Sequence, residues 1–238
     1  MRKDYTDKPI LVTGAARSGT SMVAACIHLC GAWKGNTVGP SRHNQKGMFE
    51  NHAIRQGIIK PILREMNVDP LGQYPLPETE QTIIPQNFKD DILDTIKYQG
   101  WKENLPWMYK CVKLSLIWPV WRYAFPHSKW IIVRRKEEDI VYSCMHTGFM
   151  RAFARTETLK EVNCKTEEEG WNWWVEFYKK KFVEIINNGI NAKVVWPEKM
   201  VYGDYSEIKD AIEWLGLEWN GTAVMDFIEP KLWKSRQN

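Results

Sequence analysis

The sequence predicts an α/β fold in which a parallel sheet of four to five strands is flanked by helices in three layers. Short apolar runs alternate with helix-like segments along the chain, and the run WIIV is apolar throughout. Alternation of this kind is typical of βαβ units, whose strands are parallel. An unbroken apolar run indicates a strand that is buried on both faces. Because no composition break interrupts the 238 residues, we expect one domain over residues 1–238.

Four apolar runs are the expected strands. They cover Pro9–Thr13, Trp107–Val112, Lys129–Arg134 and Ala192–Trp196. The first run stops at Gly14, and an apolar-periodic stretch from Thr20 to Cys30 follows it. This order is typical of a strand, a glycine turn and a helix.

The expected helices are recognised by capping residues and by apolar side chains at helical spacing. Asn51 is a candidate N-cap, and Thr166 with Glu169 forms a capping box. We expect helices from Asn51 to about Met66, from Phe88 to Tyr98, from Leu114 to Ala124, from Thr166 to Asn188 and, as the last helix, from Ser206 to Leu215. The loop 31–47 is long enough to carry function. The segment 69–85, with four prolines, is expected to be irregular surface chain.

Composition limits the possible partners and compartment. The net charge of +4 comes from lysines and arginines scattered among acids, so we expect no nucleic-acid partner. The five cysteines show no C-x-x-C spacing, which favours reduced thiols, and the N-terminal stretch has no long apolar run. We therefore expect a cytoplasmic protein without a membrane anchor. The thirteen tryptophans suit either core packing or a pocket for a ring-bearing or sugar-like ligand.

The turn GAARSGTS, Gly14–Ser21, is similar to the phosphate-binding loop G-x-x-x-x-G-K-[ST] of nucleoside triphosphatases, but Thr20 replaces the lysine. A strand, a glycine turn and a helix N-terminus present several backbone N–H groups to an anion. Arg17 adds a fork of donors. Three hydroxyls are also present, on Ser18, Thr20 and Ser21. The sequence therefore predicts a P-loop-like anion site, with a ligand-free glycine turn as the alternative.

The segment RKEEDIVYS, Arg135–Ser143, predicts a second anion site. The buried strand WIIVRR ends in arginines, whereas a triphosphatase needs a metal-binding aspartate there. If the three acids after Lys136 form the first turn of a helix, Ser143 lies about two turns in. The guanidinium of Arg135 and the hydroxyl of Ser143 can then converge on one phosphate. Alternatively, Arg135 pairs with one of the acids.

Together the two motifs resemble those of sulfotransferases. GAARSGTS is similar to their 5′-phosphosulfate loop G-x-x-[RK]-S-G-T-[ST], and RKEEDIVYS is similar to their 3′-phosphate element R-x-P-x-D-V-x-x-S, with Glu137 in place of proline. Three further stretches resemble the single-domain bacterial-type members: GMFEN, YKCVKLSLIWPVWRYAFPHSKWIIVRR and FIEPKL. Where that family has K-D-P-R, this chain has Lys110, Cys111, Val112 and Lys113.

The resemblance implies a soluble sulfotransferase that moves the sulfuryl group of 3′-phosphoadenosine 5′-phosphosulfate in line to a hydroxyl or amine. The acceptor would be an unidentified small molecule or carbohydrate. The sulfuryl group carries one negative charge rather than two, so hydrogen-bond donors and one or two cations can stabilise the transition state without a metal. Residues of the loop, namely Ala16, Arg17, Ser18, Gly19, Thr20 and Ser21, would hold the 5′-phosphosulfate. Arg135 and Ser143 would hold the 3′-phosphate.

Catalysis needs a general base and a cation at the leaving oxygen. Glu50, at the mouth of an expected helix, is the candidate base, and His52 is the reserve. Lys110, at a strand end, is the candidate that neutralises the bridging oxygen, and Arg17 supplies the loop's cation. Without a ligand, Glu50 is equally explained as a charge favoured by the helix dipole, and Lys110 as a strand-end surface lysine.

Two other functions remain open at this level. A magnesium-dependent small-molecule kinase shares the loop and the parallel sheet. A non-catalytic nucleotide- or nucleic-acid-binding module would use the basic balance and the aromatic residues. The acceptor of a sulfotransferase would contact the loop 31–47, the proline-rich segment and the region 149–166, none of which specifies its chemistry.

Overall fold

The computed structural model describes residues 3–42 and 44–235. Its four strands form one parallel sheet in the order β2-β1-β3-β4. They are β1 (Ile10–Gly14), β2 (Met108–Lys110), β3 (Lys129–Val133) and β4 (Ala192–Val195). The predicted α/β fold with a parallel sheet is confirmed, with four strands in the described residues.

The central strands separate two hydrophobic cores. Successive side chains of a strand point to opposite faces of the sheet. Leu11 and Ile132 belong to one core, whereas Val12 and Ile131 belong to the other. Every residue of β1 is buried, as expected for a strand covered on both faces. The sheet is therefore the middle of three layers.

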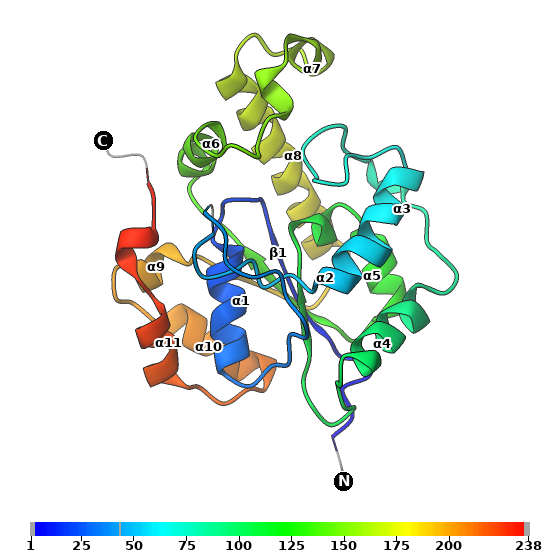
Figure 1. Cartoon of the computed structure of the whole chain (residues 1–238), viewed down its shortest axis with the longest axis vertical. Helices are drawn as coiled ribbons and strands as arrows, with labels where there is room; N and C mark the ends of the chain where they lie inside the picture. Colours follow the sequence, from blue (N-terminus) through cyan, green and yellow to red (C-terminus); the bar gives the residue numbers. More distant parts are fainter. Residues whose placement is uncertain (1–2, 43, 236–238) are drawn as a thin grey trace.

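Two sets of helices cover the sheet, and Figure 1 shows them on either side of it. One face is packed by α1 (Thr20–Leu29), α9 (Glu198–Val201), α10 (Ser206–Leu215) and α11 (Gly221–Phe227). The other is packed by α2 (His52–Ile54), the π-helical η1 (Arg55–Ile59), α3 (Lys60–Glu65), α4 (Phe88–Tyr98), α5 (Trp118–Ala124), α6 (Glu137–Met145) and α8 (Glu167–Asn187). The short α7 (Thr156–Glu161) lies at the far end of α8 in Figure 1. Single 3₁₀ turns are η2 (Thr79–Gln81), η3 (Val112–Ser115), η4 (Ala152–Ala154) and η5 (Pro230–Leu232).

Two predicted helices differ from the structure near their N-termini. Asn51 is an N-cap as predicted, and its Oδ1 accepts from Ile54 N at 3.3 Å, but the helix then widens into the π-turn η1. The helix expected from Leu114 begins only at Trp118, because Pro119 stands in its first turn and the residues before it form η3. Proline fits the first turn since its missing N–H has no partner there.

The prediction that Ser206–Leu215 is the last helix is wrong. The helix α11 and the turn η5 follow it, and α11 is capped by Asn220, whose Oδ1 accepts from Ala223 N at 3.3 Å. With only seven residues, α11 is too short to show a periodic pattern.

Aromatic residues and cysteines mostly fill the cores. Seven of the thirteen tryptophans are buried, which favours packing as the main reason for their number. All five cysteines are free thiols, and four of them are buried. No helix within the described ranges is both long and apolar enough to cross a membrane.

Candidate functional site

The loop between β1 and α1 turns in a way that requires glycine. A Cβ on Gly14 would lie 2.5 Å from the Val133 carbonyl oxygen, and Gly19 has a φ of 93°. Arg17 also has a positive φ, 71°, which is rare for a residue with a side chain. Backbone strain of this kind gathers at ligand-binding loops.

Several donors of the loop are open. The backbone N–H groups of Gly19, Thr20 and Ser21 donate to no acceptor within the described part of the chain. The Ser18 side chain is fully buried, and its Oγ has no hydrogen-bond partner among these residues either. A buried polar atom without a partner is costly unless a ligand or water satisfies it. Three amides and a hydroxyl at a helix N-terminus fit an oxyanion such as a phosphate.

Ser21 belongs to the same loop but is held from outside it. Its Oγ donates to the Met48 carbonyl at 3.2 Å and accepts from Asn44 Nδ2 at 2.9 Å. The hydroxyl therefore links the anion loop to the segment 31–50.

The structure brings the two predicted anion motifs together. Arg17 Nε donates to Ser143 Oγ at 2.9 Å, across 126 residues of sequence. Arg135 Nη1 donates to the carbonyl oxygen of Arg17 at 2.9 Å. Burial lowers the pKa of both arginines, and each guanidinium remains charged because its ordinary pKa is so high. The buried guanidinium of Arg135, the partly buried guanidinium of Arg17 and a hydroxyl thus line one side of the loop.

The alternative that Arg135 pairs with an acid can be judged from its distance to Asp139. Its Nε lies 3.9 Å from Asp139 Oδ2, which is too long for a direct hydrogen bond. Asp139 stands in the first turn of α6, as the sequence predicted. The contact is a loose ion pair, so the arginine is held mainly by carbonyl oxygens.

The C-terminal segment covers this anion site, which the sequence did not reveal. The Trp233 ring lies 4.1 Å from the Arg135 guanidinium, and a Cβ on Gly19 would lie 3.0 Å from the same ring. Arg135 Nη2 donates to the Lys234 carbonyl. Lys46 pairs with Glu229 at 2.7 Å and so joins the loop 31–47 to this segment. The family-like FIEPKL stretch just before Trp233 was the only sequence signal for it.

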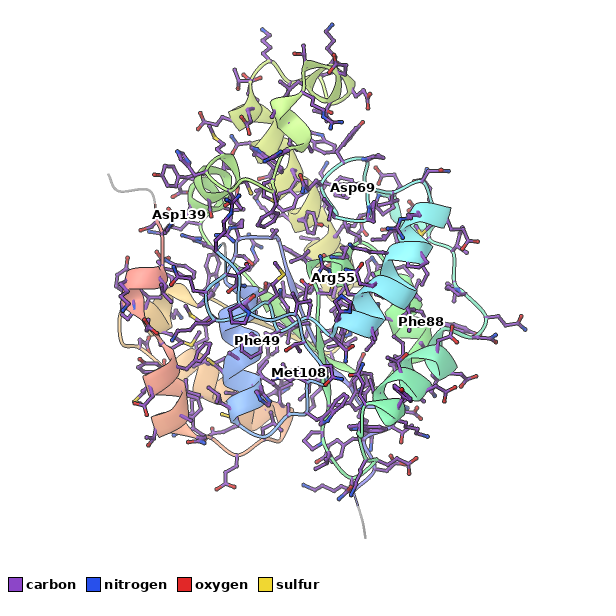
Figure 2. The ribbon with its side chains drawn as sticks, in the orientation of Figure 1. Phe49, Arg55, Asp69, Phe88, Met108 and Asp139 are labelled. Carbon is purple, nitrogen blue, oxygen red and sulfur yellow. The ribbon has the colours of Figure 1, made fainter. Side chains whose placement is uncertain are left out.

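Glu50 is the centre of a second, more deeply buried group. Its Oε1 lies 3.1 Å from Lys110 Nζ, and its Oε2 lies 3.1 Å from Arg55 Nε. Glu50 and Lys110 are 5% and 4% exposed, so Lys110 is not a surface lysine. Arg55, labelled in Figure 2, comes from the beginning of the cyan helix and lies near the middle of the molecule.

The cations set the protonation state of Glu50. Burial raises the pKa of its carboxyl, but the charges of Lys110, Lys113 and Arg55 outweigh burial and lower the pKa to about 2. The carboxylate is therefore ionised at neutral pH. A carboxylate so strongly stabilised is a weak base for as long as both ion pairs are intact.

His52, the reserve base, is exposed to solvent, whereas Glu50 is buried. Its backbone N–H donates to the Asn36 carbonyl at 2.9 Å, and no hydrogen bond or ion pair of its side chain to Lys110 or Arg17 is found in the described ranges. Its part in catalysis stays a prediction.

Sequence reasoning missed Arg55 and Lys113. Lys113 is 3% exposed and follows Lys110 by three residues, at the position of the arginine in the family's K-D-P-R run. That position was its only signal. Arg55 had none, because it stands one turn into an ordinary helical pattern. Among the residues described, no group of three or more His, Cys, Asp or Glu side chains is arranged to hold a metal ion.

Comparisons with known proteins agree on the fold. No protein-family model matches the chain, and no curated protein matches it. Among solved structures, it is similar to a sulfotransferase from Alicyclobacillus acidocaldarius, with 17% identity and a TM-score of 0.53 over 94% of this chain and 87% of that one. It is also similar to the sulfotransferase domain of the Synechococcus PCC 7002 olefin synthase, with 14% identity and a TM-score of 0.50 over 95% and 86%. The chain therefore has the P-loop-like α/β fold of sulfotransferases, which confirms the predicted resemblance in fold.

Proposed function

We propose that this protein is a sulfotransferase that uses 3′-phosphoadenosine 5′-phosphosulfate as donor. The observation that carries the proposal is the hydrogen bond from Arg17 Nε to Ser143 Oγ, 2.9 Å long, which unites the two nucleotide motifs beside a loop with open amides. The fold shared with sulfotransferases supports it. The fold alone would not be enough to support the proposal, because one fold serves many reactions.

The residues of the loop fit the donor's 5′ end. The amides of Gly19, Thr20 and Ser21, with the Ser18 hydroxyl, would hold the 5′-phosphosulfate, and Arg135 with Ser143 would hold the 3′-phosphate. The donor supplies an activated sulfuryl group. Because Arg135 now donates to the Lys234 carbonyl, we expect this carbonyl to give way when the phosphate binds.

Lys110 and Glu50 divide the chemistry between them. Lys110 Nζ, held by Glu50 Oε1 at 3.1 Å, can turn toward the phosphate oxygen that gains an electron pair as its bond to sulfur breaks. Glu50 then loses the cation that stabilises its charge most, and its pKa rises from about 2. Its carboxylate becomes able to take the proton of the acceptor hydroxyl while that oxygen bonds to sulfur.

A thermal-shift comparison of three ligands tests the proposed function against its rivals. Adenosine 3′,5′-bisphosphate, the product nucleotide, should stabilise the protein in EDTA. At a hundredfold excess over Kd the stabilisation is about 2.7 kcal/mol, which raises Tm by roughly 5–10 °C for a chain of this size. A response only to ATP with magnesium would favour the kinase, and a salt-sensitive response to an oligonucleotide would favour the binding module.

A further inference from the structure

More positive charge than negative charge is buried around Glu50. Lys110 and Arg55 share its one carboxylate at 3.1 Å each, and Lys113 is buried beside them without an ion pair among the described residues. Buried charges are normally paired, because an uncompensated ion in a protein interior is costly. Two buried lysines, the partly buried Arg55 and one carboxylate therefore leave two positive charges to be balanced.

Lys113 is fixed in place by close packing. Its Cγ would lie 3.1 Å from a Cβ on Gly72, so this glycine allows the close approach. The Gly72 carbonyl accepts hydrogen bonds from Trp174 Nε1 and Tyr178 OH, both at 2.9 Å. These bonds attach the backbone at Gly72 to α8. Burial lowers the pKa of Lys113, but Cys111 and Glu50 raise it above its ordinary value overall, so the ammonium is charged at neutral pH.

Arg55 has hydrogen-bonding capacity left over. Its Nε faces Glu50, while no hydrogen bond from its Nη1 or Nη2 is found within the described part of the chain. The fork of a guanidinium matches the two oxygens of a carboxylate or phosphate. Arg55 also begins the π-turn η1, and π-turns inside α-helices are frequent at functional sites.

The sheet topology places this excess of positive charge away from the proposed nucleotide site. In the strand order β2-β1-β3-β4, Lys110 ends β2 and Lys113 follows it, whereas Arg135 and Ser143 follow β3. The anion loop follows β1 and lies between the two groups. The donor's phosphates have their own partners on the β3 side and Lys110 serves the bridging oxygen, so Lys113 and Arg55 are left for the other substrate.

We propose that the acceptor is itself an anion: a hydroxyl-bearing molecule whose carboxylate or phosphate group binds Arg55 and Lys113. This inference rests on the proposed function and names the chemical class of its acceptor. The oxyanion supplies the missing negative charge and orients the hydroxyl toward Glu50 and the transfer point. Neutral acceptors of the same shape leave both cations uncompensated and are rejected.

The test uses inorganic anions as probes on the whole protein. The protein is first saturated with adenosine 3′,5′-bisphosphate, and this binding step is recorded separately, since its failure contradicts the proposed function rather than the acceptor class. Sulfate, phosphate and acetate are then titrated at constant ionic strength by calorimetry. We expect saturable binding of at least one anion. Preference for phosphate or acetate indicates which kind of acidic group the acceptor carries.

Variants locate the bound anion. Lys113→Met and Arg55→Met should each weaken anion binding at least tenfold and leave bisphosphate binding within twofold, which also shows that they fold. The control Lys209→Met removes an exposed lysine on α10 and should behave as wild type. The proposal is overturned if the saturated protein binds no anion, or if Lys110→Met abolishes anion binding while Lys113→Met and Arg55→Met retain it. In that last case the anion occupies the sulfuryl position.

Discussion

Two regions flank the anion loop and hold their cations in different ways. On the α6 side, Arg17 donates to a serine hydroxyl and Arg135 to two carbonyl oxygens, with Asp139 3.9 Å away. On the α2 side, Glu50 holds two cations at 3.1 Å each. Figure 2 shows the two sides through Asp139 on α6 and Arg55 on the cyan helix.

The difference separates binding from catalysis. Hydrogen bonds to uncharged oxygens hold Arg17 and Arg135, and Asp139 is a loose partner of Arg135 at 3.9 Å, so an incoming phosphate replaces only weak contacts. An ion pair neutralises its members, and Lys110 must exchange Glu50 for another anion before it can act. We therefore expect changes on the α6 side to alter nucleotide affinity and changes on the α2 side to alter turnover.

Removing Lys110 should give the largest effect. Lys110→Ala should lower kcat by about 10²–10³, the range for loss of one preorganised transition-state donor, and leave the Kd for adenosine 3′,5′-bisphosphate within about twofold. Steady-state kinetics and calorimetry measure the two quantities. Lys193→Ala, on the opposite edge strand, is the matched control. Lost nucleotide affinity with unchanged turnover would reverse the assignment of the two regions.

Neutralising Glu50 should change the pH dependence of stability. The folded pKa of about 2 lies below the ordinary 4.5, so the carboxylate stabilises the fold above pH 4.5 and this contribution is lost as the pH falls toward 2. Glu50→Gln should cost on the order of 3 kcal/mol at pH 7 and much less at pH 2.5. Urea unfolding at both pH values measures the difference. An equal loss at both would mean that the ion pairs do not stabilise the fold.

Removing Arg135 should weaken nucleotide binding without slowing the chemical step. Loss of a hydrogen bond to a charged group costs about 1.5–3 kcal/mol, so Arg135→Ala should raise the bisphosphate Kd roughly 10- to 150-fold. Turnover at saturating donor should stay near wild type. The adjacent Arg134→Ala is the control, because its guanidinium lies over the Phe182 and Trp196 rings instead. Equal effects of both variants would show only a general loss of positive charge.

Ser143 should give the smallest effect. Ser143→Ala removes the acceptor of the Arg17 Nε bond and one donor to the phosphate, which costs about 0.5–1.5 kcal/mol, or roughly 2- to 12-fold in bisphosphate Kd. Ser143→Thr keeps the hydroxyl and should recover most of the loss. If Thr fails where Ala is tolerated, the position is sensitive to volume rather than to hydrogen bonding.

The same comparison explains what the sequence could predict. The residues of the α6 side belong to two short contiguous sequence motifs. A strand end and the helix that follows it fix the relative positions of Arg135 and Ser143. Alternation of strands and helices gave the parallel sheet for a similar reason: each βαβ unit is local. Those parts depend on neighbours in the chain.

The α2 side is assembled from segments far apart in the chain. Glu50 and Lys110 were each candidates, but their 3.1 Å contact joins residues 60 positions apart and could not be predicted from spacing. Arg55 gave no signal because a π-turn looks like a helix in sequence. Trp233 was missed since its contact with Arg135 depends on how the C-terminal segment packs.

The most direct test of the central claim is a calorimetric titration of the wild-type protein with adenosine 3′,5′-bisphosphate in EDTA. The proposed function predicts one saturable site per chain, unaffected by the chelator and weakened by Arg135→Ala but not by Lys110→Ala. Absence of binding in EDTA, together with binding of ATP that requires magnesium, would contradict it.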